Sequence, residues 1–99
     1  MAIKELEIPP DALTDPDAFE MIRIWAAHEK LQVTIKGNLL GGTAGFGSLI
    51  ADLVDHGSLL YSQREKMTLE RAKHEILSGF RERLDDDDKN MNGEIPVEH

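Results

Sequence analysis

The sequence predicts an α+β fold of three helices and a very small sheet. Apolar residues recur at three- and four-residue steps in three separate stretches, as they do on the buried face of a helix. Residues 31–36 instead alternate strictly between apolar and polar, as in a half-buried strand. A chain of 99 residues buries too little surface for two cores. We therefore expect one globular domain over residues 1–84.

The first helix is expected over residues 16–29. Thr14 or Asp15 can accept hydrogen bonds from the first free amides of a helix, and Pro16 suits the first helical position. The apolar residues that follow at helical steps are Phe19, Ile22, Trp25 and Ala26.

Residues 31–36 form the clearest strand, with Leu31, Val33 and Ile35 on one side and polar residues on the other. A strand needs a partner for its backbone groups. Residues 3–8 can supply one, because Leu6 and Ile8 alternate there with two glutamates. The other source is a second copy of the chain, and the sheet is then completed across a homodimer.

Residues 37–47 contain five glycines and are expected to form a loop. Helical spacing then resumes from about residue 46 to residue 62, and the apolar stripe continues beyond Gly57, which favours an unbroken helix. A third helix is expected over residues 69–84 with Thr68 as its N-cap. Residues 85–99 combine four consecutive aspartates with Asn, Gly and Pro, and this composition predicts a disordered acidic tail.

Composition excludes several classes of function. The net charge of −8 disfavours binding to nucleic acid, which depends on clustered Lys and Arg. The chain has no cysteine, which excludes disulfides and Cys-ligated zinc or iron–sulfur clusters. Its four histidines are scattered, so neither a metal nor another cofactor is expected. The first residues lack the apolar core of a signal peptide and no apolar run reaches a membrane-spanning length, so we expect a cytoplasmic protein that does not bind membranes.

One candidate for a ligand site remains, and its residues are Gly42, Gly45, Gly47, Asp52 and His56. A glycine-rich loop between a strand and a helix can bind phosphate through its backbone amides, but this one lacks the lysine of a P-loop and the third glycine of a dinucleotide-binding motif. Asp52 and His56 share a helix face, where a carboxylate can orient an imidazole. The simpler interpretation is a flexible connection followed by a surface ion pair.

Three stretches resemble a known family: Leu6 to Leu13 (LEIPPDAL) with Asp15 to Ala18 and Trp25, the pair Phe46-Gly47, and Ala51 to His56 (ADLVDH). The sequence over residues 6–84 is similar to short uncharacterised bacterial proteins, mostly proteobacterial, that carry a domain of unknown function. Phe46 stands where that family usually has Trp. The resemblance implies a small α+β domain in a bacterial cytoplasm, and it carries no activity to this chain.

Our leading hypothesis for function is a small, non-enzymatic protein-interaction module that forms a homodimer. The alternative is a small-ligand-binding protein or enzyme that uses the glycine loop with Asp52 and His56. A third hypothesis is that the acidic surface docks a basic partner protein.

Overall fold

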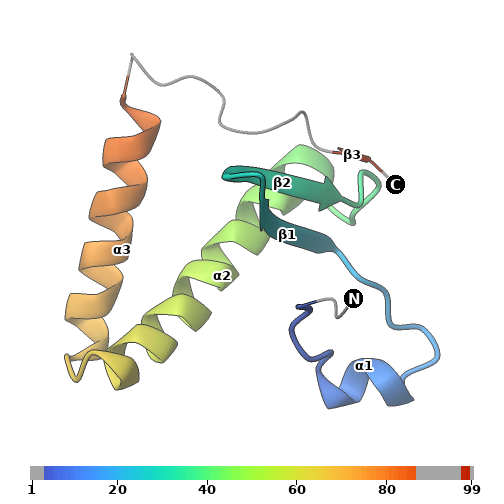
Figure 1. The fold of residues 1–99 in the computed structure, drawn as a ribbon, viewed down its shortest axis with the longest axis horizontal. Coiled ribbons are helices and arrows are strands. Elements are labelled where there is room, and N and C mark those ends of the chain that lie inside the picture. Colours follow the sequence, from blue (N-terminus) through green and yellow to red (C-terminus); the bar gives the residue numbers. More distant parts are fainter. Residues whose placement is uncertain (1–3, 87–96, 99) are drawn as a thin grey trace.

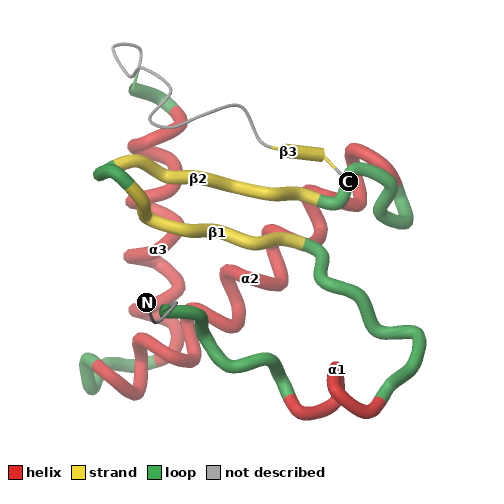
Figure 2. Tube along the Cα trace, turned by 45° about the vertical axis from the view of Figure 1, so that its right-hand side comes forward, coloured by secondary structure: helices red, strands yellow, loops and turns green. Residues whose placement is uncertain are grey.

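The computed structural model describes residues 4–86 and 97–98, and it confirms a small α+β fold. The element order is α1 (Pro10–Thr14), β1 (Ile22–Ala27), β2 (Lys30–Ile35), α2 (Gly42–Arg64), α3 (Leu69–Leu84) and β3 (Val97–Glu98). Two hairpins dominate the structure, one of strands and one of helices (Figure 1). The strand hairpin lies across the N-terminal half of α2 (Figures 1 and 2). Of the helices described, none is both long and apolar enough to cross a membrane.

The prediction of a helix over residues 16–29 is wrong. The only helix in this part of the described chain is α1, which begins at Pro10 and ends before the predicted start. Residues 22–27 instead form β1, in which Ile22, Ile24 and Ala26 alternate with other residues at the period of a strand. The same segment had also satisfied the helical period, and its Ile and Trp side chains favour a strand once a partner is at hand.

The strand predicted over residues 31–36 is confirmed as β2, and its partner is β1 of the same chain. The two strands are antiparallel, with Ile22 opposite Ile35 and Ile24 opposite Val33. A two-residue turn joins them, and both of its residues, His28 and Glu29, have positive φ angles of 52° and 59°. A turn of this kind matches the right-handed twist of the strands.

Residues 4–8 belong to no strand, so the predicted pairing of residues 3–8 with β2 is wrong over the described part of that segment. The opposite side of β2 is instead paired in parallel with β3, where Thr34 lies opposite Val97 and Ile35 opposite Glu98. Most of the predicted acidic tail, residues 87–96 and 99, lies outside the described residues. The strand β2 therefore has β1 of its own chain along its full length on one side, and β3 beside Thr34 and Ile35 on the other.

The helix α2 begins at Gly42, so the second half of the predicted loop over residues 37–47 is helical. Gly41 precedes the helix with a φ angle of 89°, which glycine adopts without strain. Gly45 is also constrained, because a Cβ atom on it would lie 2.4 Å from the carbonyl oxygen of Leu40. The glycines therefore let the chain fold tightly against the first turn of α2. As predicted, the helix continues through Gly57.

The third predicted helix is confirmed as α3 over Leu69–Leu84. Thr68 caps it, because its hydroxyl accepts a hydrogen bond of 3.1 Å from the backbone N–H of Arg71. The joined ends of α2 and α3 pack together around Ala72 and Ser58, which are 2% and 1% exposed. The Ser58 hydroxyl donates to the carbonyl oxygen of Val54 at 2.7 Å, so its burial leaves no polar group unpaired.

Away from their joined ends the two helices diverge (Figure 1). The apolar stripe of α3 continues along the diverging arm, where Phe80 is 42% exposed and Leu84 58% exposed. Among the described residues, Ala72 and Ser58 are the only two that are classed as buried. The single chain therefore has a very small core.

Candidate functional site

The predicted ligand-site residues all lie on α2, but the helix spreads them along its length. Gly42, Gly45 and Gly47 occupy its first two turns, and His56 comes fourteen residues after Gly42. At about 1.5 Å per residue, the first glycine and the imidazole are about 21 Å apart along the axis. The glycines and His56 therefore do not converge on one pocket.

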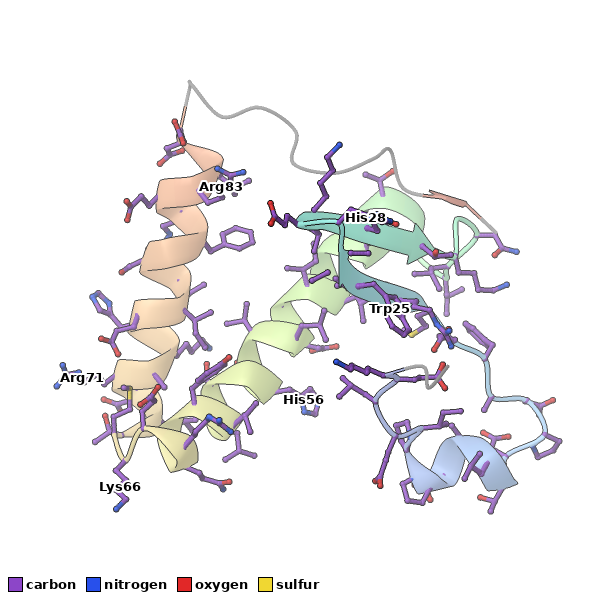
Figure 3. The ribbon with its side chains drawn as sticks, in the orientation of Figure 1. Trp25, His28, His56, Lys66, Arg71 and Arg83 are labelled. Atoms are coloured by element: carbon purple, nitrogen blue, oxygen red, sulfur yellow. The ribbon has the colours of Figure 1, made fainter. Side chains whose placement is uncertain are left out.

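Asp52 and His56 are both exposed on α2, and no hydrogen bond or ion pair joins them. The His56 side chain projects from the side of α2 that faces away from α3 (Figure 3). Asp55, in contrast, forms an ion pair of 3.1 Å with Lys73 of α3. Asp55 therefore contacts α3 and not His56. Both partners of this ion pair are largely exposed, so it contributes little to the stability of the helix pair.

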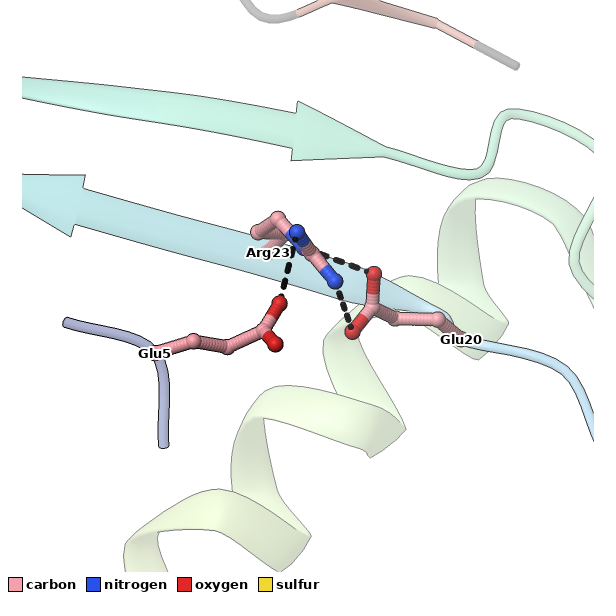
Figure 4. Close-up of polar contacts among 3 residues, drawn as sticks. All are labelled: Glu5, Glu20 and Arg23. Carbon is pink, nitrogen blue, oxygen red and sulfur yellow. Dashed lines mark hydrogen bonds and ion pairs between the residues drawn. The ribbon is translucent and has the colours of Figure 1, made fainter. Parts of the chain in front are cut away.

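A second polar cluster, centred on Arg23 of β1, has no counterpart in the sequence analysis. The Arg23 guanidinium donates two hydrogen bonds to the Glu20 carboxylate, at 2.9 and 3.3 Å, and forms an ion pair of 3.1 Å with Glu5 (Figure 4). The hydrogen bond to Glu20 and the charge of Glu20 are the main causes that raise the pKa of Arg23, with a smaller contribution from Glu5. Glu5 and Arg23 are eighteen positions apart in the chain, so no local pattern could reveal the contact.

This cluster ties the N-terminal segment to β1 and offers little as a binding site. It borders a shallow surface depression lined by Glu20, Met21, Ile22, Arg23, Thr34 and Lys36. The Arg23 guanidinium is already engaged by two carboxylates, and the Lys36 ammonium lies 5.3 Å from the centre of the Phe19 ring. In the described chain, no group of three or more His, Asp or Glu side chains is placed to hold a metal ion.

The most prominent feature of the described surface is apolar. Among the described side chains, fourteen large apolar ones are at least 42% exposed, and they come from the N-terminal segment, the three helices, β1, β2 and the loops between them. They are Leu6, Ile8, Leu13, Phe19, Ile24, Leu31, Leu40, Leu53, Leu59, Leu60, Tyr61, Leu69, Phe80 and Leu84. Contiguous exposed apolar surface marks sites of interaction with other molecules.

The sheet contributes an apolar face and an open edge to this surface. Residues directly opposite each other in an antiparallel pair lie on the same face. Six apolar residues therefore share one face, namely Ile22, Ile24 and Ala26 of β1 and Leu31, Val33 and Ile35 of β2. This face is incompletely covered, since Ile24 is 58% and Leu31 51% exposed. In the described sheet β1 is an edge strand, with β2 on one side and no strand on the other.

The helices contribute a second apolar region. Leu53 and Leu60, seven residues apart on α2, lie on one side of that helix and are 48% and 55% exposed. Phe80 and Leu84 are also exposed, on the diverging arm of α3. Leu59 and Tyr61 lie on other sides of α2 and are 51% and 47% exposed. Apolar residues around so much of a helix are typical of one that is covered on more than one side.

Comparison with known proteins places the chain in a family without assigning an activity. No curated protein matches it. A solved structure from Rhodopseudomonas palustrus CGA009, described as a "putative pyruvate dehydrogenase", superposes with a TM-score of 0.70 and 20% sequence identity over 95% of each chain. At this identity the likeness concerns the fold alone. A family model described as a domain of unknown function matches residues 5–88, which confirms the predicted resemblance to proteins that carry such a domain. The chain belongs to the family Domain of unknown function (DUF5076).

Proposed function

We propose that the chain is a small, non-enzymatic protein-interaction module that acts as a homodimer. The observation that carries this proposal is the near absence of a core in the described chain, where two residues are buried while fourteen large apolar side chains are at least 42% exposed. Fully burying one such side chain is worth about 1.5–3 kcal/mol. Covering even a few of them would add as much as the whole stability of a small domain.

A second copy of the chain is the partner that best fits this requirement. If the chain is stable only when its apolar surface is covered, the partner must be present whenever the chain folds. A second copy of the same chain meets this condition, because copies are synthesised together. Homodimer interfaces are also more apolar than those of transient complexes, which matches the exposed side chains of β1, α2 and α3. The net charge of −8 opposes association of two copies, so apolar contacts must supply its driving force.

Sedimentation equilibrium of the full chain over a hundredfold range of concentration tests the proposal. We expect a dimer, with a melting temperature that rises with protein concentration because dissociation accompanies unfolding. The same measurement on a chain that ends at Leu84, which lacks β3 as well as the acidic residues, shows what residues 85–99 contribute to association. A full-length chain that stays monomeric throughout, with a melting temperature independent of concentration, would refute the proposal.

The alternative, a ligand site at Gly42, Gly45, Gly47, Asp52 and His56, has less support because these residues are spread along α2. It predicts that a nucleotide or a small metabolite raises the melting temperature and that His56→Gln cancels the rise. Docking of a basic partner protein predicts a complex that dissociates at high salt. A homodimeric module predicts instead that small ligands leave the dimer unchanged and that high salt does not dissociate it, because salt screens the repulsion between two acidic chains.

A further inference from the structure

The outer edge of β1 presents a row of backbone groups without partners among the described residues. The backbone N–H of Lys36 donates to the carbonyl oxygen of Met21 at 2.9 Å, so these two residues form a hydrogen-bonded pair. Hydrogen-bonded and non-hydrogen-bonded pairs alternate along an antiparallel ladder. The residues of β1 whose backbone N–H and C=O groups point toward β2 are therefore Arg23, Trp25 and Ala27. It follows that Ile22, Ile24 and Ala26 direct their N–H and C=O groups away from β2.

Nothing in the described structure protects this edge. Natural proteins blunt open edges with prolines, bulges, charged residues or a covering segment. The β1 strand has no proline, pairs with β2 in an unbroken register, and carries one charged residue, Arg23. The N-terminal segment reaches β1 through the ion pair between Glu5 and the Arg23 side chain (Figure 4), and residues 4–8, the part of it that the structure describes, form no backbone hydrogen bond with the strand.

We infer that β1 of a second copy pairs antiparallel with this edge, about a two-fold axis that passes through Ile24. This inference rests on the proposed homodimer and specifies its interface. In this register Ile24 lies opposite Ile24 of the partner subunit, and Ile22 lies opposite the partner's Ala26. Every outward-facing group of the strand then has a partner, through about six hydrogen bonds across the axis. The edge is thus complementary to itself, as a two-fold interface requires.

The side chains favour the same register. Arg23 comes to lie opposite the partner's Trp25 in a closely spaced, non-hydrogen-bonded pair, where the planar face of the guanidinium can stack on an indole ring while its N–H groups keep their contacts with Glu20 and Glu5. The apolar faces of the two sheets join on one side, and Ile24, now 58% exposed, is covered there. A two-fold axis through Arg23 would instead place two arginines opposite each other. An axis through Trp25 would leave the outward groups of Ile22 without partners.

Single-cysteine variants test the pairing cleanly, because the chain has no cysteine of its own. In the proposed register the two Cα atoms at position 24 are about 5.5 Å apart, within the range of a disulfide. Leu31→Cys is the matched control, since Leu31 lies on the same face and is 51% exposed, close to the 58% of Ile24. The two copies of β2 would lie three strand spacings, about 14 Å, apart, and the two copies of position 31 would also be offset by four residues along the strands, so they are too far apart for a disulfide. Under mild oxidation at low concentration we expect a covalent dimer from Ile24→Cys and a monomer from Leu31→Cys on non-reducing gels.

Two proline variants at neighbouring positions provide a second test. The N–H of Ala26 points outward, so Ala26→Pro should preserve the β1–β2 ladder and lower the dimer affinity at least tenfold in sedimentation equilibrium. The N–H of Ala27 faces Lys30 across the hairpin, so Ala27→Pro should disrupt the hairpin itself. A wild-type dimer with no position-24 crosslink and an unaffected Ala26→Pro variant would overturn the β1 pairing alone. A monomeric wild-type chain would overturn this inference together with the proposed homodimer.

Discussion

Gly57 of α2 lies against Ile76 of α3, where a Cβ atom added to the glycine would stand 3.7 Å from the Ile76 Cδ1 atom. This is an ordinary van der Waals distance, so alanine fits without moving either helix. Gly57→Ala should therefore raise the free energy of unfolding by about 0.5–1 kcal/mol, because glycine in a helix interior is that much less favourable than alanine. Urea denaturation measures the change. Gly79→Ala on α3, where an added Cβ meets nothing within 4 Å, is the control and should give a similar gain.

The first two turns of α2 offer a pair of glycines with opposite expectations. A Cβ on Gly45 would lie 2.4 Å from the Leu40 carbonyl oxygen, whereas a Cβ on Gly47 would meet nothing within 4 Å. Gly45→Ala must displace backbone and should lower the free energy of unfolding by about 1–3 kcal/mol. Gly47→Ala should raise it by up to about 1 kcal/mol. Equal effects in thermal denaturation would contradict the tight approach of residue 40 to the helix.

The cap of α3 provides a third prediction. The Thr68 hydroxyl accepts the hydrogen bond from Arg71 N–H that would otherwise be lost at the start of the helix. Thr68→Ala should lower the free energy of unfolding by about 1 kcal/mol, and Thr68→Ser should restore most of it because serine caps as well. Denaturant midpoints of the three proteins decide the matter. If serine fails to restore stability, the threonine contributes through its methyl group and not through the cap.

The β1–β2 turn stores strain that can be relieved. His28 and Glu29 have φ angles of 52° and 59°, which side chains other than Asn, Asp and Gly rarely adopt. Replacing the two residues with Asn-Gly, the preferred pair for such a turn, should raise the free energy of unfolding by about 1 kcal/mol or more. The reversed pair, Gly-Asn, is the control for composition. No gain in the melting temperature with Asn-Gly would indicate that the turn has another conformation.

Local patterns predicted several elements correctly because their determinants lie close together in the chain. Thr68 and the apolar stripe that follows it specify α3 without reference to any other segment. Strict alternation over residues 31–36 likewise specifies a strand in any context. Local patterns could not predict whether Gly42 and His56 lie close together. Their distance depends on whether the glycines belong to a loop or to α2, and the structure places them in the helix.

The sequence by itself determined α3, α2 from about residue 46 onward, the strand β2 and the family, since each depends on patterns within a few turns of chain. Tertiary structure decided that residues 22–27 are a strand. Ile22, Trp25 and Ala26 fit a helical face, while Ile22, Ile24 and Ala26 fit a strand face equally well, so periodicity could not choose between them. Hydrogen bonding to β2 made the choice, because a strand is stable only with a partner for its backbone groups. The backbone groups at the outer edge of β1 have no such partner among the described residues, and this is the reason for proposing a second copy there.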